Sequence, residues 1–292
     1  MKHIVLIGGW SGISHLIRAF TRVPDWSIHA IVATSDSGGS TGVIRDSYNI
    51  PAIGDIVKNL AALGWEQASW MTYRHQDGFL AGHTTGNLWL LGLIEQYGLS
   101  DGIKKAHNLL WYTQHEIIPA TEDVHDIEVK TKTETIRGEW PIIQCRTLSN
   151  NVDDIYLQPK VSAAPRALQA LRQADMIIIG PGTLYTSIIA SLLPEGMSEE
   201  IRNSKAKKIF IANAANFPPG HCDEYTLSTY ISEIHRFGKI WDFTAILAHD
   251  GSDVPEKDKI EIDRTPDVTR MNCLDTPESS LGGKYDSIKR NT

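Results

Sequence analysis

The chain has 292 residues, of which 41% are hydrophobic and 22% charged, a composition typical of a soluble globular protein and not of a disordered or fibrous one. Its 35 acidic and 28 basic residues give a formal net charge of −7, and the bases do not cluster beyond "KAKK" at 205–208, so we expect no nucleic-acid partner. No apolar run approaches the roughly 20 residues that cross a bilayer, and the N-terminal stretch lacks a signal-peptide pattern, so we expect a cytoplasmic protein with no membrane partner.

Buried strands alternate with helical patterns along the chain. Continuously apolar runs predict strands at 3–8, 28–34, 175–180, 207–213 and 243–249. Helical patterns are found at 12–21, 51–63, 81–94, 163–174, 183–193 and 223–237. Such apolar runs are typical of parallel strands covered on both faces. The sequence therefore predicts an α/β fold with a doubly wound, mostly parallel Rossmann-like sheet.

The middle and the end of the chain differ from this pattern. Residues 126–142 alternate between apolar and polar side chains and are rich in Val, Ile, Thr and Trp, which predicts a small antiparallel insertion at about 120–145. From 251 to 292 the chain is charged and poor in apolar residues, so we expect a polar tail after a single domain at 1–250.

The first strand exits through "IGGWSGIS", where Gly8, Gly9 and Gly12 permit a tight turn and Ser11 supplies a hydroxyl. The helix that follows directs its N–H groups to the same place, which favours an anion site. The stretch is neither GxGxxG nor a P-loop, because no GK[ST] follows. A βα turn that needs glycine for its geometry alone remains the alternative.

The second strand exits through "SDSGGSTGVIRD". Here Gly38 and Gly39 could bind phosphate through their backbone, while Asp36 binds a hydroxyl or a magnesium ion. The alternative is a capping Asp in a solvent loop, but two glycine loops after consecutive strands favour binding. Arg45 is interpreted as a rim charge, a structural ion pair or a phosphate contact.

Two helix starts and two later strand exits carry further candidates. Asp55 and Asn59 stand four residues apart on one helix face, although the helix dipole alone would favour Asp55 there. His83 and Asn87 stand at the start of a helix that is apolar nearly all round, as caps or as ligand donors. The later strands exit through "GPGTLYTS" at 180–187, which contains Gly182 and Thr183, and through "ANAANFPPGHCDEY", which contains Asn213 and Asn216.

In this order and spacing, the motifs resemble the YvcK/CofD-like family, which contains gluconeogenesis factors and phospholactate transferases. The matching stretches are "GGWSG", "TSDSGGSTGVIR", "IPAIGDIVKNLAAL", "GHTTGNLWL" and "IGPGTLYTSIIASLL", between residue 4 and about residue 230. The chain is more similar to the YvcK branch. The resemblance implies a nucleotide ligand, either a UDP-sugar or a dinucleotide such as NAD(P), bound across Gly9, Trp10, Ser11 and Gly12, near Asp36, Gly38 and Gly39, in a cleft lined by Asp55, Asn59, His83, Asn87 and Asn213 and closed by Gly182 and Thr183.

Three departures from the family pattern are present. Trp10 replaces a glycine and could shrink a phosphate seat or stack on a ring. Ser37 replaces the second acid of a pair, which leaves Asp36 as the one predicted magnesium ligand. The stretch "PPGHCDEY" at 218–225 replaces a PGET-type segment, so we expect that wall of the cleft to differ from the family's.

Two functions remain open, and the sequence leaves the oligomeric state undecided between a monomer and a homo-oligomer. The favoured one is a nucleotide-binding regulator of carbon metabolism and cell shape, because backbone donors are abundant and no Ser–His–Asp or Cys–His arrangement recurs. The alternative is a magnesium-dependent transferase that moves a phospholactyl-type group from a nucleotide diphosphate donor, since such chemistry relies on positioning and charge neutralisation. An NAD-dependent oxidoreductase is disfavoured by the glycine pattern.

Overall fold

A parallel β-sheet forms the centre of the computed structural model, which describes residues 1–112, 114–145, 148, 151–215, 225–249, 260–263 and 268–271. Within these residues the sheet has seven strands in the order β10-β9-β8-β7-β1-β2-β3, and all neighbours pair in parallel. The strands are β1 (Lys2–Gly8), β2 (Trp26–Val32), β3 (Glu116–Pro119), β7 (Met176–Ile179), β8 (Lys207–Ile211), β9 (Ala245–His249) and β10 (Val268–Met271). The chain order reverses between β1 and β7, as in other doubly wound sheets. The predicted fold class is confirmed.

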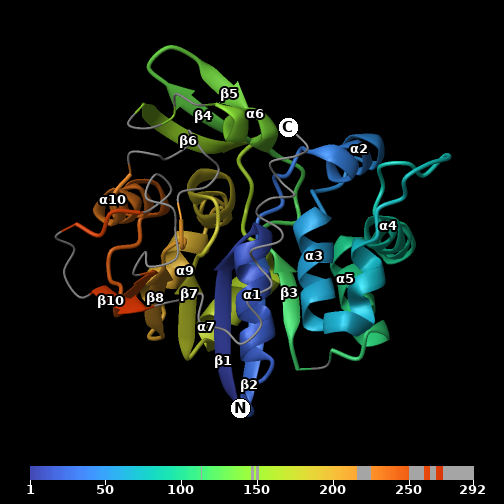
Figure 1. Cartoon of the computed structure of the whole chain (residues 1–292), viewed down its shortest axis with the longest axis horizontal. Helices are drawn as coiled ribbons and strands as arrows, with labels where there is room; N and C mark the ends of the chain where they lie inside the picture. Colours follow the sequence, from blue (N-terminus) through green and yellow to red (C-terminus); the bar gives the residue numbers. More distant parts are fainter. Residues whose placement is uncertain are drawn as a thin grey trace.

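Helices cover both faces of this sheet, because each central strand is apolar on both sides. Ile4 and Leu6 of β1 belong to one hydrophobic core, and Val5 and Ile7 belong to the other. The first core packs under α1 (Trp10–Phe20), α3 (Gly54–Leu63), α4 (Thr85–Tyr97) and α5 (Leu99–Leu109) (Figure 1). The second packs under α7 (Pro165–Gln173), the π-helical turn η2 (Leu184–Ile189), α8 (Ala190–Leu192), α9 (Met197–Asn203) and α10 (Leu227–Gly238).

The predicted antiparallel insertion is present, with different bounds. It comprises β4 (Asp126–Thr131), β5 (Thr135–Arg137) and β6 (Val152–Gln158), paired in the order β5-β4-β6, at the top of the molecule in Figure 1. The prediction placed 139–142 in the hairpin, but Gly138, at φ 91°, turns the chain into α6 (Glu139–Gln144). The third strand lies beyond the expected boundary near 145.

Several elements were not predicted. The helix α2 (Gly39–Tyr48) was interpreted only as a binding loop, because its Gly- and Ser-rich start is a poor helix former. The short β3, the 3₁₀ helix η1 (Trp65–Thr72) and α5 were not assigned. Strand β10 falls within the expected polar tail, where it pairs with β9. No helix of the described residues is long and apolar enough to cross a bilayer.

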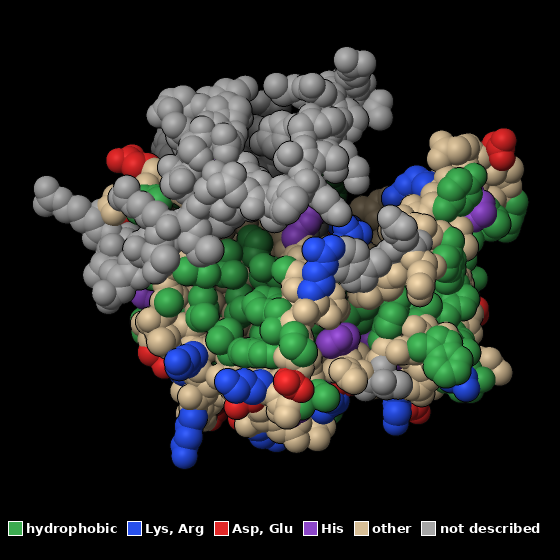
Figure 2. Space-filling model, turned by 60° about the horizontal axis from the view of Figure 1, so that its bottom comes forward, with side chains coloured by type: hydrophobic (Ala, Val, Ile, Leu, Met, Phe, Trp, Pro, Cys, Tyr) green, Lys and Arg blue, Asp and Glu red, His purple; other side chains and the backbone are tan. Residues whose placement is uncertain are grey.

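One face of the molecule is shown in Figure 2. Hydrophobic side chains gather in its middle, and Lys, Arg, Asp and Glu side chains lie along the lower rim. Charges of both signs are therefore interspersed on this rim.

A buried ion pair fixes the insertion to α2. Arg45, in the last turn of α2, is 8% exposed, and its guanidinium donates to the carboxylate of Asp126 at the start of β4. The same carboxylate accepts a hydrogen bond of 2.8 Å from Nε of Arg137 in β5. Of the three interpretations of Arg45, the structure supports the structural ion pair.

We expect Asp126→Ala to lower the free energy of unfolding by about 3–5 kcal/mol, because it leaves the Arg45 charge buried without its carboxylate. Replacing both partners by apolar residues, in Arg45→Met/Asp126→Leu, should cost less, since neither charge then has to be desolvated. Urea unfolding of both variants measures the difference. A double variant at least as unstable as Asp126→Ala would contradict this account.

Candidate functional site

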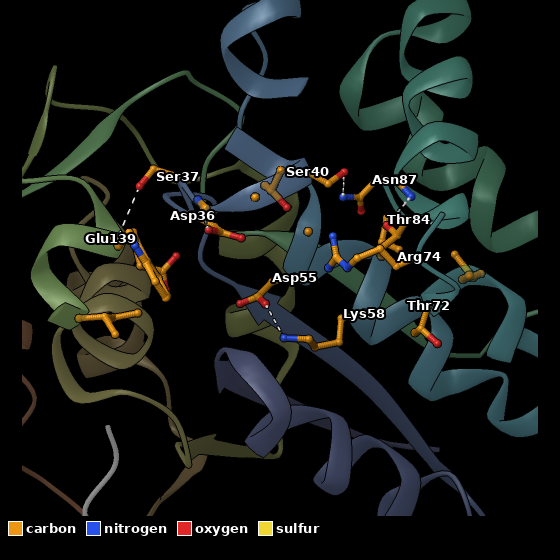
Figure 3. A pocket seen from close by; sticks show the side chains of 18 residues that line it. Asp36, Ser37, Ser40, Asp55, Lys58, Thr72, Arg74, Thr84, Asn87 and Glu139 are labelled. Atoms are coloured by element: carbon orange, nitrogen blue, oxygen red, sulfur yellow. Dashed lines mark hydrogen bonds and ion pairs between the residues drawn. The ribbon is translucent and has the colours of Figure 1, made fainter. Parts of the chain in front are cut away.

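A pocket of about 530 Å³ opens beyond the carboxyl end of β2 (Figure 3). The starts of four helices contribute to its wall: α2, α3, α4 and α6. Its lining residues are Asp36, Ser37, Gly38, Gly39, Ser40, Thr41, Gly54, Asp55, Val57, Lys58, Met71, Thr72, Arg74, Thr84, Asn87, Glu139, Trp140 and Ile143. Such a volume suits a ligand of nucleotide size.

Helix N-termini give the pocket an attraction for anions. Neither α2 nor α3 has a side-chain cap, and the first turn of α2 contains no acidic residue. Gly39 adopts φ 47°, and nothing would lie within 4 Å of an added Cβ there, so the backbone faces open space. Free N–H groups at a helix start carry partial positive charge, which phosphate groups neutralise.

Three carboxyl groups from separate segments meet in the same pocket: Asp36 after β2, Asp55 in the first turn of α3, and Glu139 at the start of α6. Oδ1 of Asp36 accepts a 2.7 Å hydrogen bond from the N–H of Gly38. Burial, helped by the nearby charge of Asp55, still raises the pKa of Asp36. Burial and the charges of Asp36 and Asp55 raise the pKa of Glu139 well above its ordinary value. The charge of Asp55 therefore makes both Asp36 and Glu139 harder to ionise.

Two cationic side chains stand beside these acids. Nζ of Lys58 lies 3.6 Å from Oδ1 of Asp55. Arg74 donates to the backbone oxygen of Gly82, and Figure 3 shows its guanidinium directed into the same space as Lys58. The pocket thus combines negative carboxylates with positive groups that could bind phosphate oxygens.

Hydroxyl and amide groups complete the wall at the start of α4. Nδ2 of Asn87 donates to Oγ of Ser40 over 3.1 Å. Oγ of Ser40 also lies 3.0 Å from Nδ1 of His83, and Thr84 caps the helix by accepting from the N–H of Asn87 at 3.4 Å. His83 therefore positions Ser40 without lining the pocket, whereas Asn87 lines it.

The remaining sequence candidates lie at the exits of β1, β7 and β8, next to the pocket but outside its lining. Asn213 clasps the backbone of Gly182 with two hydrogen bonds of 2.8 and 2.9 Å. The hydroxyl of Thr183 is buried and lies 2.7 Å from Oγ of Ser187. A Cβ on Gly9 would lie 2.7 Å from Oδ2 of Asp55 and 2.9 Å from Oγ of Ser187. The loops after β1, β7 and β8 therefore contact one another, and the absence of a side chain at Gly9 lets the loop after β1 approach Asp55.

The other candidates either have framework positions or lie outside the described residues. A Cβ on Gly12 would lie 2.7 Å from the backbone oxygen of Pro181, so the glycine permits α1 to pack against the loop after β7. Asn59 is fully buried between α1 and α3. The side chains of Trp10 and Ser11, together with Asn216 and residues 218–224, lie outside the described residues.

Of the predicted set, the pocket is thus lined by Asp36, Gly38, Gly39, Asp55 and Asn87. Lys58, Arg74, Glu139 and Trp140 were missed. Lys58 lies in the same helix as the predicted residues Asp55 and Asn59. Its i, i+3 spacing from Asp55 is a local pattern that could have predicted it as a site residue. Glu139 and Trp140 carry no local signal, because only the packing of the insertion brings them to β2.

A magnesium ion fits this donor set as a shared ion. No three His, Cys, Asp or Glu side chains among the described residues are arranged to hold a metal by themselves. Magnesium is commonly bound by one or two carboxylates plus ligand phosphates and water. Asp36 and Asp55 supply such carboxylates beside the helix starts that would receive the phosphates.

We expect Asn59→Ala to reduce the free energy of unfolding by about 1–3 kcal/mol in the absence of any ligand. Its Oδ1 accepts from Oγ of Ser14 over 2.9 Å, and its Nδ2 donates to the backbone oxygen of Asp55 over 2.8 Å. Thermal and urea unfolding measure the loss, and Ser14→Ala, which removes one partner only, should cost less. Unchanged stability in Asn59→Ala would show that the amide has no framework role.

We expect Glu139→Gln to raise the melting temperature of the ligand-free protein. The pKa of Glu139 is higher in the folded than in the unfolded state, so its ionisation opposes folding as pH rises through the folded pKa. Glutamine mimics the protonated acid. The gain should therefore be absent in acid, grow as pH rises from the ordinary carboxyl pKa to the raised pKa of the folded state, and level off above it, as measured by melting curves across pH. A gain that is largest at low pH would contradict the expected coupling.

The chain is similar to known proteins of one family. The model of the family described as 2-phospho-L-lactate transferase CofD matches residues 4–273. A gluconeogenesis factor from Halalkalibacterium halodurans is 34% identical over 256 residues, which cover 85% of this chain and 77% of the relative. A protein from Thermotoga maritima, named provisionally as a gluconeogenesis factor, is 30% identical over 306 residues, covering 98% and 96% of the two chains.

A solved structure agrees. The crystal structure of a UPF0052 family member from Bacillus halodurans superposes with a TM-score of 0.85 at 28% identity, covering 93% of each chain. The family model, which matches residues 4–273, includes every loop and helix start that lines the pocket. The chain therefore belongs to the CofD family, among relatives named gluconeogenesis factors, as its motifs predict.

Proposed function

We propose that this protein binds a nucleotide ligand, a UDP-sugar or a dinucleotide, in the pocket beyond β2 and acts in the cytoplasm as a YvcK-type regulator of carbon metabolism and cell shape. One observation carries the proposal: the uncapped starts of α2 and α3 share a pocket with Lys58 and Arg74. Positive dipole ends and two cations around one cavity favour a ligand with more than one phosphate group.

The carboxylates support a magnesium ion as part of the bound ligand. Burial raises the pKa of Asp36 and of Glu139 in the ligand-free pocket, and the charge of Asp55 adds to both shifts. A bound magnesium ion would neutralise part of this charge and bind phosphate oxygens. In this proposal Asp36 and Asp55 hold the ion, while Lys58 and the N–H groups of α2 orient the phosphates.

The alternative is a magnesium-dependent transferase that moves a phospholactyl-type group from a nucleotide diphosphate donor. The description of the matching family names a transferase, and the same groups could neutralise charge on a transferred phosphate ester. The regulator remains favoured because the relatives found are named gluconeogenesis factors.

We expect UDP-sugars or NAD(P), with magnesium, to raise the melting temperature of the protein in a concentration-dependent manner. Lys58→Ala should weaken binding by about tenfold, because a charge-assisted hydrogen bond to phosphate is lost. Lys104→Ala, on the exposed side of α5, is the matched control and should bind normally. If no nucleotide shifts the melting temperature of the wild-type protein, the proposed function is wrong.

Asp36→Asn separates the two functions. A regulator should lose mainly affinity, measured by calorimetry with the best nucleotide and magnesium. A transferase should lose mainly turnover, measured as product formed from a nucleotide diphosphate donor and candidate acceptors. Product formation by the wild-type protein that Asp36→Asn abolishes at saturating donor would favour the transferase.

A further inference from the structure

The pocket is larger than its phosphate-binding part. The groups suited to phosphates and magnesium are the helix starts at Gly38–Thr41 and Gly54, with Asp36, Asp55 and Lys58. They form one wall of a cavity of about 530 Å³, the size that holds a whole drug-sized molecule. The rest of the ligand must therefore contact the two flanks of this wall.

The two flanks differ in chemistry. Figure 3 places Thr72, Thr84 and Asn87 on one side of Asp36 and Asp55, and Glu139 on the other. The first side offers hydroxyl and amide groups, which suit a polyhydroxylated group. Beside Glu139, the lining residues are Trp140 and Ile143, three positions apart on α6 and thus neighbours on its surface. This side suits a flat apolar group.

Trp140 combines exposure with a fixed position. The residue is 54% exposed although it lines the pocket. Its backbone N–H lies 3.5 Å from Oγ of Ser37, which ties the start of α6 to the glycine loop after β2. Trp111 and Trp241 are also exposed, at 86% and 57%, but neither lines the pocket. A large aromatic side chain at the mouth of a polar pocket is a stacking surface for a ring.

Resting on the proposed function, we infer that the nucleobase of the ligand stacks on Trp140, while the sugar or second nucleoside faces the start of α4. The insertion thereby selects ligands with a base, and the core of the fold holds their phosphates. Stacking on an indole accepts any base, because every base has a π-face. The affinity should therefore depend strongly on whether the ligand has a base and only weakly on which base it is.

The test compares three probes, each with magnesium: inorganic pyrophosphate, UDP and glucose 1-phosphate. We expect Trp140→Ala to weaken UDP binding by roughly tenfold and to leave the affinity for pyrophosphate and glucose 1-phosphate unchanged. Trp140→Phe should retain most of the UDP affinity, and Trp111→Ala should match the wild type. Calorimetry gives the affinities, and melting curves without ligand verify that each variant is folded.

The outcomes separate this inference from the proposed function. If the wild-type protein binds neither pyrophosphate nor UDP, the proposed function fails. If pyrophosphate binds normally but Trp140→Ala leaves UDP affinity unchanged, the inference alone is overturned. Equal weakening of all three probes would assign Trp140 to the shape of the phosphate seat, and selective weakening of glucose 1-phosphate would place the sugar on the indole. Either result overturns the inference.

Discussion

The pocket depends on three carboxyl groups, Asp36, Asp55 and Glu139, that the fold brings together. They come from three segments of the chain. Burial and the charge of Asp55 raise the pKa of Asp36, and burial with the charges of Asp36 and Asp55 raises the pKa of Glu139. In a stable scaffold such groups are normally separated or paired, because burying like charges together costs free energy. Here Lys58 lies 3.6 Å from Asp55, and the uncapped starts of α2 and α3 add partial positive charge. This arrangement is the reason why we propose a ligand that brings a magnesium ion and phosphates together.

Rigid packing behind the pocket maintains this arrangement. The exits of β1, β7 and β8 are braced by the clasp of Asn213 on Gly182 and by the hydroxyl of Thr183. Gly9 and Gly12 permit the close approach of neighbouring backbone and side chains that this bracing needs. Thr183 and Asn213, which the sequence predicted as ligand contacts, thus support the loops around the pocket instead. Loops that position one another keep their N–H groups in place without the ligand.

The insertion makes the pocket more than a variation on a doubly wound sheet. Its small sheet packs on the core through residues such as Ile127 and Ile155, while Arg45 and Asp126 tie it to α2. These contacts deliver Glu139 and Trp140 to a wall otherwise built from loops of the core. In doubly wound folds the position of the ligand crevice follows from the strand order. The side chains of Glu139 and Trp140, in contrast, reach this crevice only because of the insertion. In our proposal, the core therefore binds the phosphates and the insertion recognises the ring.

The sequence alone determined the class of fold, because buried parallel strands require continuous apolar runs and these are visible at 3–8, 28–34 and 175–180. It also predicted Asp36, Gly38, Gly39, Asp55 and Asn87, which line the pocket, since polar residues at strand exits and helix starts are local patterns. It could not separate these from Asn59, Thr183 and Asn213, whose hydrogen bonds are satisfied by distant segments. Only the tertiary structure placed Glu139 and Trp140 in the pocket. They lie about 100 residues from Asp36 in the chain, and no local periodicity encodes how an inserted sheet packs over a loop.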